Sequence, residues 1–124
     1  MEDLPLCSLA IKSSIHDYEV VFSQSIIESL KSELQTDDVI FIDKNLFSHL
    51  NEKVKRSITT RNHILINATE KQKSYTALTP IIEELIERGL RKNNRLIAIG
   101  GGITQDITAF IASIMYRGIE WLFF

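Results

Sequence analysis

Three consecutive glycines, Gly100, Gly101 and Gly102, follow the apolar run at residues 96–99 and precede a helical pattern of apolar residues. This order predicts a strand, a glycine turn and a helix start in direct succession. Backbone N–H groups at a helix start have no partner within the helix, and they point towards any anion bound there. A plain tight turn is served by one glycine. Three in succession favour a cradle for a phosphate group.

Two short runs, at residues 39–42 and 96–99, are apolar without polar alternation. Such runs are typical of strands in a parallel sheet, because helices cover both of its faces. Strand-like and helix-like segments alternate around them along the chain. We therefore expect an α/β fold, a Rossmann-like parallel sheet flanked by helices, in a single domain over residues 1–124.

The expected elements follow from the spacing of the apolar residues. Strands are predicted at residues 9–13, 18–22, 39–42, 63–66, 96–99 and 119–124, the first two forming a hairpin around a polar link at 14–17. Helices are predicted over 26–34 behind Ser25, over 46–55, over 81–88 before Gly89, and over 103–114. Pro80 either opens the third helix or kinks a helix that begins near Ser74, and the sequence leaves this choice open.

The net charge of −2 gives no global reason to expect nucleic acid or an anionic membrane as a partner. No apolar run approaches the roughly 20 residues that a membrane-spanning helix needs. The single cysteine, Cys7, excludes an internal disulfide, so we expect a reducing compartment, the cytoplasm. The three histidines, His16, His49 and His63, lack metal-site spacing, and no metal ligand is assigned.

The glycine spacing does not match GxGxxG, and the acidic residue expected about 20 positions downstream is missing. An ordinary Rossmann dehydrogenase is therefore disfavoured. An acidic residue instead ends an earlier predicted strand, where Asp43 stands with Asn45 nearby. Asp43 is placed either to accept hydrogen bonds from ribose hydroxyls or to cap the next helix, and spacing alone does not decide between them.

Three further charged positions have both a structural and a functional interpretation. Asp106 in the first turn of a helix is favoured by the helix dipole, but it would repel a diphosphate and would need to face a hydroxyl or amide of a ligand. Glu70 and Lys73, three residues apart, form either a surface pair or part of one cleft, and the residues alone favour the surface pair. Arg117 complements a helix carboxyl end or clamps an anionic group.

Residues 96–106, followed by Arg117 and Gly118, resemble the strand-GGGxxxD-helix-RG segment of the 3-dehydroquinate synthase family. Residues 41–45 resemble the strand-end aspartate motif of that family, and residues 70–73 resemble its ExxK segment. The resemblance covers essentially the whole chain and is weakest before about Asp37. It implies a dehydroquinate synthase-like amino-terminal domain that binds NAD.

The resemblance also implies roles for individual residues. The residues implied to contact NAD are Asp43, Asn45, Glu70, Lys73, Gly100, Gly101, Gly102, Ile103 and Asp106. Of these, Asp43, Glu70 and Lys73 would contact the nucleotide end. Gly101, Gly102 and Ile103 would cradle the diphosphate, and Asp106 would meet the nicotinamide ribose. Arg117 would bind the substrate of the neighbouring subunit, which implies a homodimer.

The implied activity of the full-length protein is that of a carbon–oxygen lyase. It would eliminate phosphate from a seven-carbon sugar phosphate and close a carbocycle, as in the shikimate pathway, using NAD and a divalent metal, Zn or Co. Residues 118–124 are an apolar β-prone run without a polar tail, which predicts a fragment. We expect the metal site and the catalytic residues to lie outside this chain, and the fragment alone to be inactive.

Two positions depart from the family pattern, and they leave the substrate open. Gln105 stands where the family usually has glycine, and Thr108 with Ala109 replaces a frequent small-Gly pair. The alternatives are another sugar phosphate cyclase of the aminocyclitol or valiolone type, a polyol or iron-type alcohol dehydrogenase, and a stand-alone nucleotide-binding module. Ile103 favours a cyclase over the dehydrogenases, which usually have a small hydroxyl residue at this position.

Overall fold

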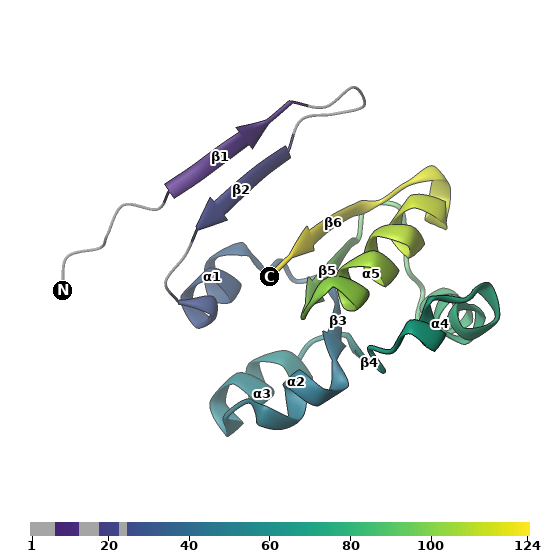
Figure 1. The fold of residues 1–124 in the computed structure, drawn as a ribbon, viewed down its shortest axis with the longest axis horizontal. Helices are drawn as coiled ribbons and strands as arrows, with labels where there is room; N and C mark the ends of the chain where they lie inside the picture. Colours follow the sequence, from purple (N-terminus) through teal and green to yellow (C-terminus); the bar gives the residue numbers. More distant parts are fainter. Residues whose placement is uncertain (1–6, 13–17, 23–24) are drawn as a thin grey trace. The chain divides into compact units, whose positions relative to one another are not determined.

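The computed structural model describes residues 7–12, 18–22 and 25–124 (Figure 1). Its contacts divide the chain into two units, Met1–Glu33 and Leu34–Phe124. In the first unit, strands β1 (Cys7–Ile11) and β2 (Tyr18–Phe22) pair antiparallel and helix α1 (Ile26–Glu33) follows. The Glu28 N–H donates to Ser25 Oγ at 3.3 Å, so the predicted cap is confirmed. The predicted link at 14–17 lies outside the described residues.

The second unit is built on a parallel four-stranded sheet in the order β4-β3-β5-β6 (Figure 1). Its strands are β3 (Val39–Asp43), β4 (His63–Ile66), β5 (Arg95–Ile99) and β6 (Glu120–Phe123). The chain adds β4 on one side of β3, then returns across β3 to add β5 and β6 on the other. The direction of strand addition therefore reverses between β3 and β5, and ligands of open parallel sheets bind beyond the carboxyl ends at such a reversal.

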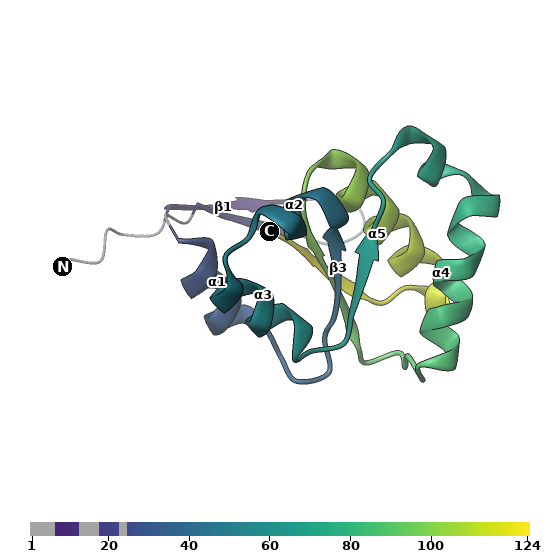
Figure 2. The ribbon, with the colours of Figure 1, turned by 90° about the horizontal axis from the view of Figure 1, so that it is seen from below.

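Helices lie on both sides of this sheet, as predicted (Figure 2). Helices α2 (Lys44–His49) and α3 (Glu52–Thr59) lie on one side, and α4 (Tyr75–Glu87) and α5 (Gly102–Ile114) on the other. Side chains of α4 and α5, among them Leu85 and Ile111, share one apolar cluster with Phe41 and Leu96 of the central strands. Residues 39–42 and 96–99 are buried, which explains why these runs carry no polar alternation.

The single helix predicted over 46–55 is wrong, because two helices replace it. Helix α2 ends at His49, and Leu50 has an extended backbone with ψ of 151°. Asn51 then begins α3, with its Oδ1 accepting the N–H of Val54 at 3.0 Å. An asparagine side chain that satisfies a free N–H favours a new helix start over a continued helix.

Helix α4 resolves the two alternatives for Pro80. It begins at Tyr75, where the side chain of Ser74 accepts the N–H of Ala77, so Pro80 lies inside a helix that begins near Ser74. The helix ends before Gly89, as predicted, and Gly89 has a φ of +81°. A glycine in this left-handed conformation is a common way to terminate a helix.

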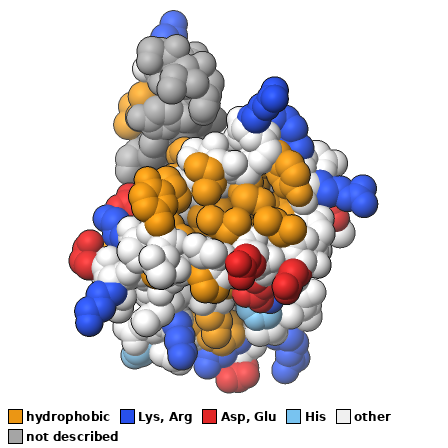
Figure 3. Space-filling model, turned by 90° about the vertical axis from the view of Figure 1, so that its right-hand side faces the viewer, with side chains coloured by type: hydrophobic (Ala, Val, Ile, Leu, Met, Phe, Trp, Pro, Cys, Tyr) orange, Lys and Arg blue, Asp and Glu red, His pale blue; other side chains and the backbone are white. Residues whose placement is uncertain are grey.

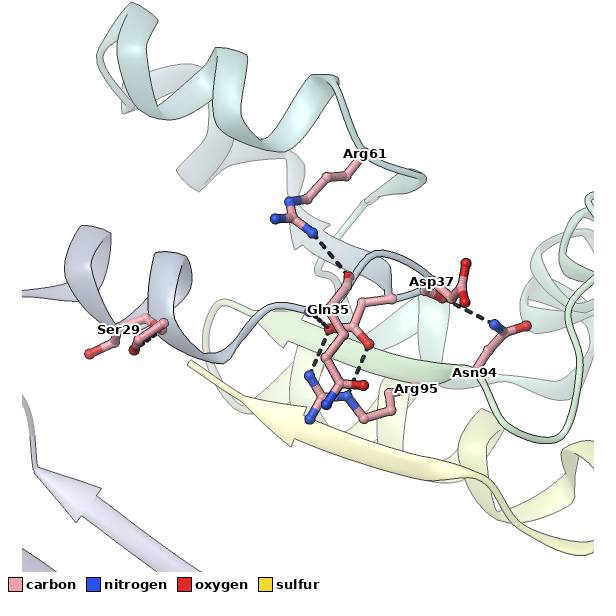
Figure 4. A network of polar contacts seen from close by, with 8 residues as sticks. Ser29, Gln35, Asp37, Arg61, Asn94 and Arg95 are labelled. Atoms are coloured by element: carbon pink, nitrogen blue, oxygen red, sulfur yellow. Dashed lines mark hydrogen bonds and ion pairs between the residues drawn. The ribbon is translucent and has the colours of Figure 1, made fainter.

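The amino ends of β3 and β5 are joined by a buried ion pair (Figure 4). Arg95 donates through Nε to Asp38 Oδ1 at 2.9 Å and through Nη2 to Asp38 Oδ2 at 2.7 Å. The side chain of Asp38 is 2% exposed and that of Arg95 is 11% exposed. The Gln35 N–H also donates to Asp38 Oδ2, so each oxygen of this buried carboxylate has a partner. Sequence patterns did not single out this pair, because its members are 57 positions apart.

Candidate functional site

The carboxyl ends of the two central strands bring Asp43 and Gly100 into contact. Gly100 follows β5 with a φ of +151°, a conformation that other residues rarely adopt. A methyl group built on Gly100 would lie 3.1 Å from the Asp43 Cβ and 3.0 Å from the Thr104 Oγ1. Both the backbone angle and the lack of space therefore require glycine here.

Helix α5 begins with backbone N–H groups that have no acceptor in the described part of the chain. Gly101 is the N-cap and makes no side-chain cap bond, and the first backbone bond of the helix runs from the Gln105 N–H to the Gly101 carbonyl at 3.1 Å. The N–H groups of Gly101, Gly102, Ile103 and Thr104 thus remain available. A methyl group on Gly101 or Gly102 would meet no atom within 4 Å, so an anion has room to approach the backbone.

Asp43 caps helix α2 and still has ligand-binding capacity. Its Oδ1 accepts the N–H of Asn45 at 2.9 Å, as the cap interpretation predicted. The second carboxylate oxygen has no partner in the described part of the chain. The side chain is half-buried beside Gly100, at the same edge of the sheet as the free N–H groups. The two interpretations of Asp43 are therefore compatible.

Lys73 connects two acidic residues that are distant in sequence. The turn η1 (Glu70–Lys73) follows β4, and the Lys73 Nζ lies 2.9 Å from Asp106 Oδ2 and 3.9 Å from Glu70 Oε2. The hydrogen bond to Asp106, then the charges of Asp106 and Glu70, raise the pKa of Lys73. Glu70 and Lys73 form the expected surface pair, and Lys73 also reaches the start of α5. The ion pair with Asp106 was not predicted.

A hollow of about 430 Å³ lies beside this ion pair. It is lined by Lys73, Ser74, Tyr75, Leu78, Asp106, Ile107 and Phe110. The rings of Tyr75 and Phe110 meet edge to face, with centroids 5.6 Å apart. Apolar walls with a few charged groups at the rim are typical of small-molecule sites. Sequence reasoning missed Tyr75 and Phe110, and nothing in their spacing of 35 residues signals the contact.

Apolar side chains extend beyond the hollow. Figure 3 shows hydrophobic side chains gathered on the side of the molecule where Figure 1 places α4. The exposed apolar residues that α4 and α5 contribute include Tyr75, Ile86 and Ile114. On the edge strand β6, Trp121 and Phe123 stack at 4.3 Å and are 39% and 37% exposed.

The remaining predicted site residues lie in different places. Ile103 is half-buried and packs against the core, so its contribution at the turn is its backbone N–H. Arg117 is exposed and lies beyond the carboxyl end of α5, in the turn η2 (Met115–Arg117). The 13 residues of α5 separate it from the glycine turn by about 20 Å. The structure therefore gathers the predicted NAD residues at one edge of the sheet and Arg117 at the other.

A metal-binding cluster and a membrane-spanning helix are both absent from residues 7–12, 18–22 and 25–124. No three or more His, Cys, Asp or Glu side chains are grouped so that they could hold a metal ion. No helix in this part of the chain has the length and apolar character needed to cross a membrane.

Known proteins match this chain in sequence. The family described as 3-dehydroquinate synthase N-terminal matches residues 63–124, which is half of the chain. The 3-dehydroquinate synthase of Staphylococcus carnosus is 32% identical over 115 residues, covering 86% of this chain and 32% of that protein. The 3-dehydroquinate synthase of Pelagibacter ubique is 27% identical over 125 residues, covering 94% of this chain and 34% of that protein.

Solved structures match its fold. Two structures of 2-deoxy-scyllo-inosose synthase have TM-scores of 0.72 and 0.71 at 18% identity, covering 94% of this chain. One of them is complexed with carbaglucose-6-phosphate, NAD+ and Co2+. The chain spans about a third of the length of the curated relatives that it matches. The fold is that of 2-deoxy-scyllo-inosose synthase, and because the family description matches half of the residues, the chain belongs to the 3-dehydroquinate synthase family and corresponds to its amino-terminal portion.

Proposed function

We propose that this chain is the NAD-binding portion of a 3-dehydroquinate synthase-like sugar phosphate cyclase. One observation carries the proposal: the free N–H groups of Gly101 to Thr104 lie at the reversal point between β3 and β5. They are flanked by Asp43 on one side. The ion pair of Lys73 with Asp106 lies on the same helix just after its first turn, because α5 begins at Gly102 and its first turn contains no acidic residue, so the placement of Asp106 predicted from the sequence is wrong. A dinucleotide requires N–H donors for its diphosphate, oxygen acceptors for its ribose hydroxyls, and a positive charge nearby.

The residues present fit NAD. Because Gly101 and Gly102 carry no side chain into the open space above the turn, a diphosphate can accept directly from the backbone N–H groups. The free carboxylate oxygen of Asp43 can accept from a ribose hydroxyl. When bound, NAD supplies a hydride acceptor for a substrate alcohol.

Lys73 and Asp106 hold opposite charges within one contact. Lys73 supplies positive charge near the diphosphate, and its pairing offsets the repulsion between Asp106 and that diphosphate. Asp106 keeps an oxygen that can accept from a hydroxyl of the nicotinamide ribose. Glu70 lies in the same turn η1 as Lys73, with its Oε2 3.9 Å from the Lys73 Nζ. Its carboxylate adds a second acceptor for the nucleotide end of NAD.

Several finer assignments belong to this proposal. The whole protein would act as a lyase in the cytoplasm on a seven-carbon sugar phosphate, with a divalent metal and the catalytic residues in a domain that this chain does not contain. Residues 1–124 would form one NAD-binding domain. Arg117, exposed and about 20 Å from the turn, would bind the substrate of the neighbouring subunit in a homodimer.

Titration calorimetry with NAD and with ADP-ribose tests the proposal. We expect both to bind to this chain, and Lys73→Ala to weaken binding by about tenfold, the loss of one charge-assisted hydrogen bond. Lys71→Ala is the matched control, because Lys71 lies in the same turn without contacting Asp106. Absence of NAD binding by the folded chain, or equal losses in both variants, would overturn the proposed site.

A phosphate-release assay tests the assignment of catalysis to another part of the protein. With NAD, a divalent metal and the seven-carbon sugar phosphate, we expect no inorganic phosphate from this chain alone. Release above a buffer control would place catalytic residues within residues 1–124.

A further inference from the structure

The peptide group between Gly100 and Gly101 is held by a side chain of α5. The Gly100 carbonyl accepts from Gln105 Nε2 at 3.3 Å. The described residues contain no cis peptide bond, so the carbonyl of Gly100 and the N–H of Gly101 point in opposite directions. With the carbonyl turned towards Gln105, the Gly101 N–H is directed away from that side chain.

Thr104 offers a competing donor for the same carbonyl. Its side chain is fully buried, and within the described residues its Oγ1 has no hydrogen-bond partner. A helical threonine commonly donates to the carbonyl four residues earlier, which for Thr104 is that of Gly100. Thr108 makes this bond, donating to the Thr104 carbonyl at 2.7 Å. Thr104 does not, although its hydroxyl lies beside Gly100.

These two observations have one explanation. A buried hydroxyl without a partner is costly, so its persistence needs a compensating arrangement. Gln105 holds the Gly100 carbonyl in an orientation that Thr104 does not use, and this orientation also sets the direction of the Gly101 N–H. The Gly100 carbonyl therefore has two candidate donors, the Gln105 amide and the Thr104 hydroxyl. In the structure, the Gln105 amide donates to it.

We propose that Gln105 is a positioning residue that aims the Gly101 N–H at a bound diphosphate. Without its amide, the Gly100 carbonyl turns to the Thr104 hydroxyl, and the Gly101 N–H turns with it. This inference rests on the proposed NAD site and adds a residue to it. It also gives the unpartnered Thr104 hydroxyl a defined role, as the donor of the alternative, binding-incompetent turn.

The test compares Gln105→Met, which keeps the bulk of the side chain but cannot donate, with Thr104→Val, which removes the competing donor. The probes are NAD and inorganic pyrophosphate, measured by calorimetry. We expect Gln105→Met to weaken both by about fivefold to tenfold, the range of one lost hydrogen bond. Thr104→Val combined with Gln105→Met should recover part of the loss that Gln105→Met shows alone.

Crystal structures of the unchanged chain and of Gln105→Met without ligand give a readout that does not depend on NAD. In the variant we expect the Gly100 carbonyl within hydrogen-bond distance of Thr104 Oγ1. A carbonyl that keeps its direction, or equal affinities in Gln105→Met and the unchanged chain, would overturn the inference. A chain that binds no NAD but shows the carbonyl turning would overturn the proposed function while supporting the role of Gln105 in the turn.

Discussion

The two edges of the parallel sheet differ in whether their polar groups have hydrogen-bond partners. At the amino edge, Asp38 is buried, and both of its carboxylate oxygens accept hydrogen bonds from Arg95, which is 11% exposed. At the carboxyl edge, the N–H groups of the α5 start have no acceptor in the described residues, and the Thr104 hydroxyl has none either. Polar groups with partners stabilise the fold, whereas backbone N–H groups without an acceptor can donate to a ligand. The comparison therefore separates residues that hold the sheet together from residues that we propose to bind a ligand.

Removing the buried carboxylate at the amino edge should have the largest effect on stability. Asp38→Ala removes the buried carboxylate that pairs with the largely buried Arg95 guanidinium, and breaking a buried pair costs about 3–5 kcal/mol. Urea unfolding monitored by Trp121 fluorescence measures the loss. Asp37→Ala is the control, because Asp37 is exposed and its hydrogen bond to Asn94 uses the backbone carbonyl. Similar midpoints for both variants would contradict the structural role of the pair.

Two glycine substitutions should separate stability from binding at the carboxyl edge. Gly100→Ala introduces a left-handed alanine and contacts of 3.0 to 3.1 Å, which we expect to cost about 1–3 kcal/mol of stability. Gly101→Ala meets no atom within 4 Å, so its main effect should be weaker NAD binding. Thermal unfolding and calorimetry of both variants measure the contrast. A Gly101→Ala chain that binds NAD normally would argue against a diphosphate at this turn.

Thr104→Val should raise the stability of the chain. The substitution keeps the shape of the side chain and removes a buried hydroxyl that has no partner in the described residues, so we expect a gain of about 1 kcal/mol. Differential scanning calorimetry gives the change in Tm. Thr108→Val is the matched control: it removes a hydroxyl that donates to Thr104, and it should lower the Tm. A fall in both variants would show that the Thr104 hydroxyl has a partner.

The smallest effect is expected from the exposed ion pair, and it should depend on pH. The pKa of Lys73 is raised in the folded chain by its hydrogen bond to Asp106. Stabilisation by a cation with a raised pKa is complete below its unfolded pKa, about 10.4 for lysine, and is lost as the pH rises through the folded value. The stability difference between the unchanged chain and Lys73→Met should stay constant from pH 7 to 9 and shrink above about pH 10.4. A difference that shrinks below pH 9 would contradict this assignment.

The sequence predicted most of the secondary structure, and its errors have local causes. Strands at 39–42 and 96–99 follow from apolar runs that are typical of a parallel sheet covered on both faces, and both are confirmed, as is the predicted strand at 63–66. The helix over 46–55 was predicted from apolar spacing, but the cap at Asn51 divides it. Apolar spacing does not report a side chain that competes for backbone N–H groups. Pro80 remained ambiguous because both a first-turn and an interior position keep the same face buried.

The candidate site was predicted residue by residue, but its contacts were not. Asp43, the three glycines, Lys73 and Asp106 were each assigned from motifs, and whether they bind NAD stays a prediction. The ion pair of Lys73 with Asp106 and the contact of Gly100 with Thr104 and Asp43 were not predicted. Side chains 33 or 57 positions apart meet only because the crossover connections bring strand ends to one edge.

By itself, the sequence determined the α/β class, the parallel sheet and the glycine turn before α5, because apolar runs, helical spacing and consecutive glycines are local signals of backbone conformation. Only the tertiary structure decided which polar groups find partners. The order β4-β3-β5-β6 places Asp43 against Gly100, and the packing of α5 leaves its first N–H groups free while Gln105 takes the Gly100 carbonyl. Hydrogen bonds between distant residues depend on distance and direction in space, and a linear pattern carries neither.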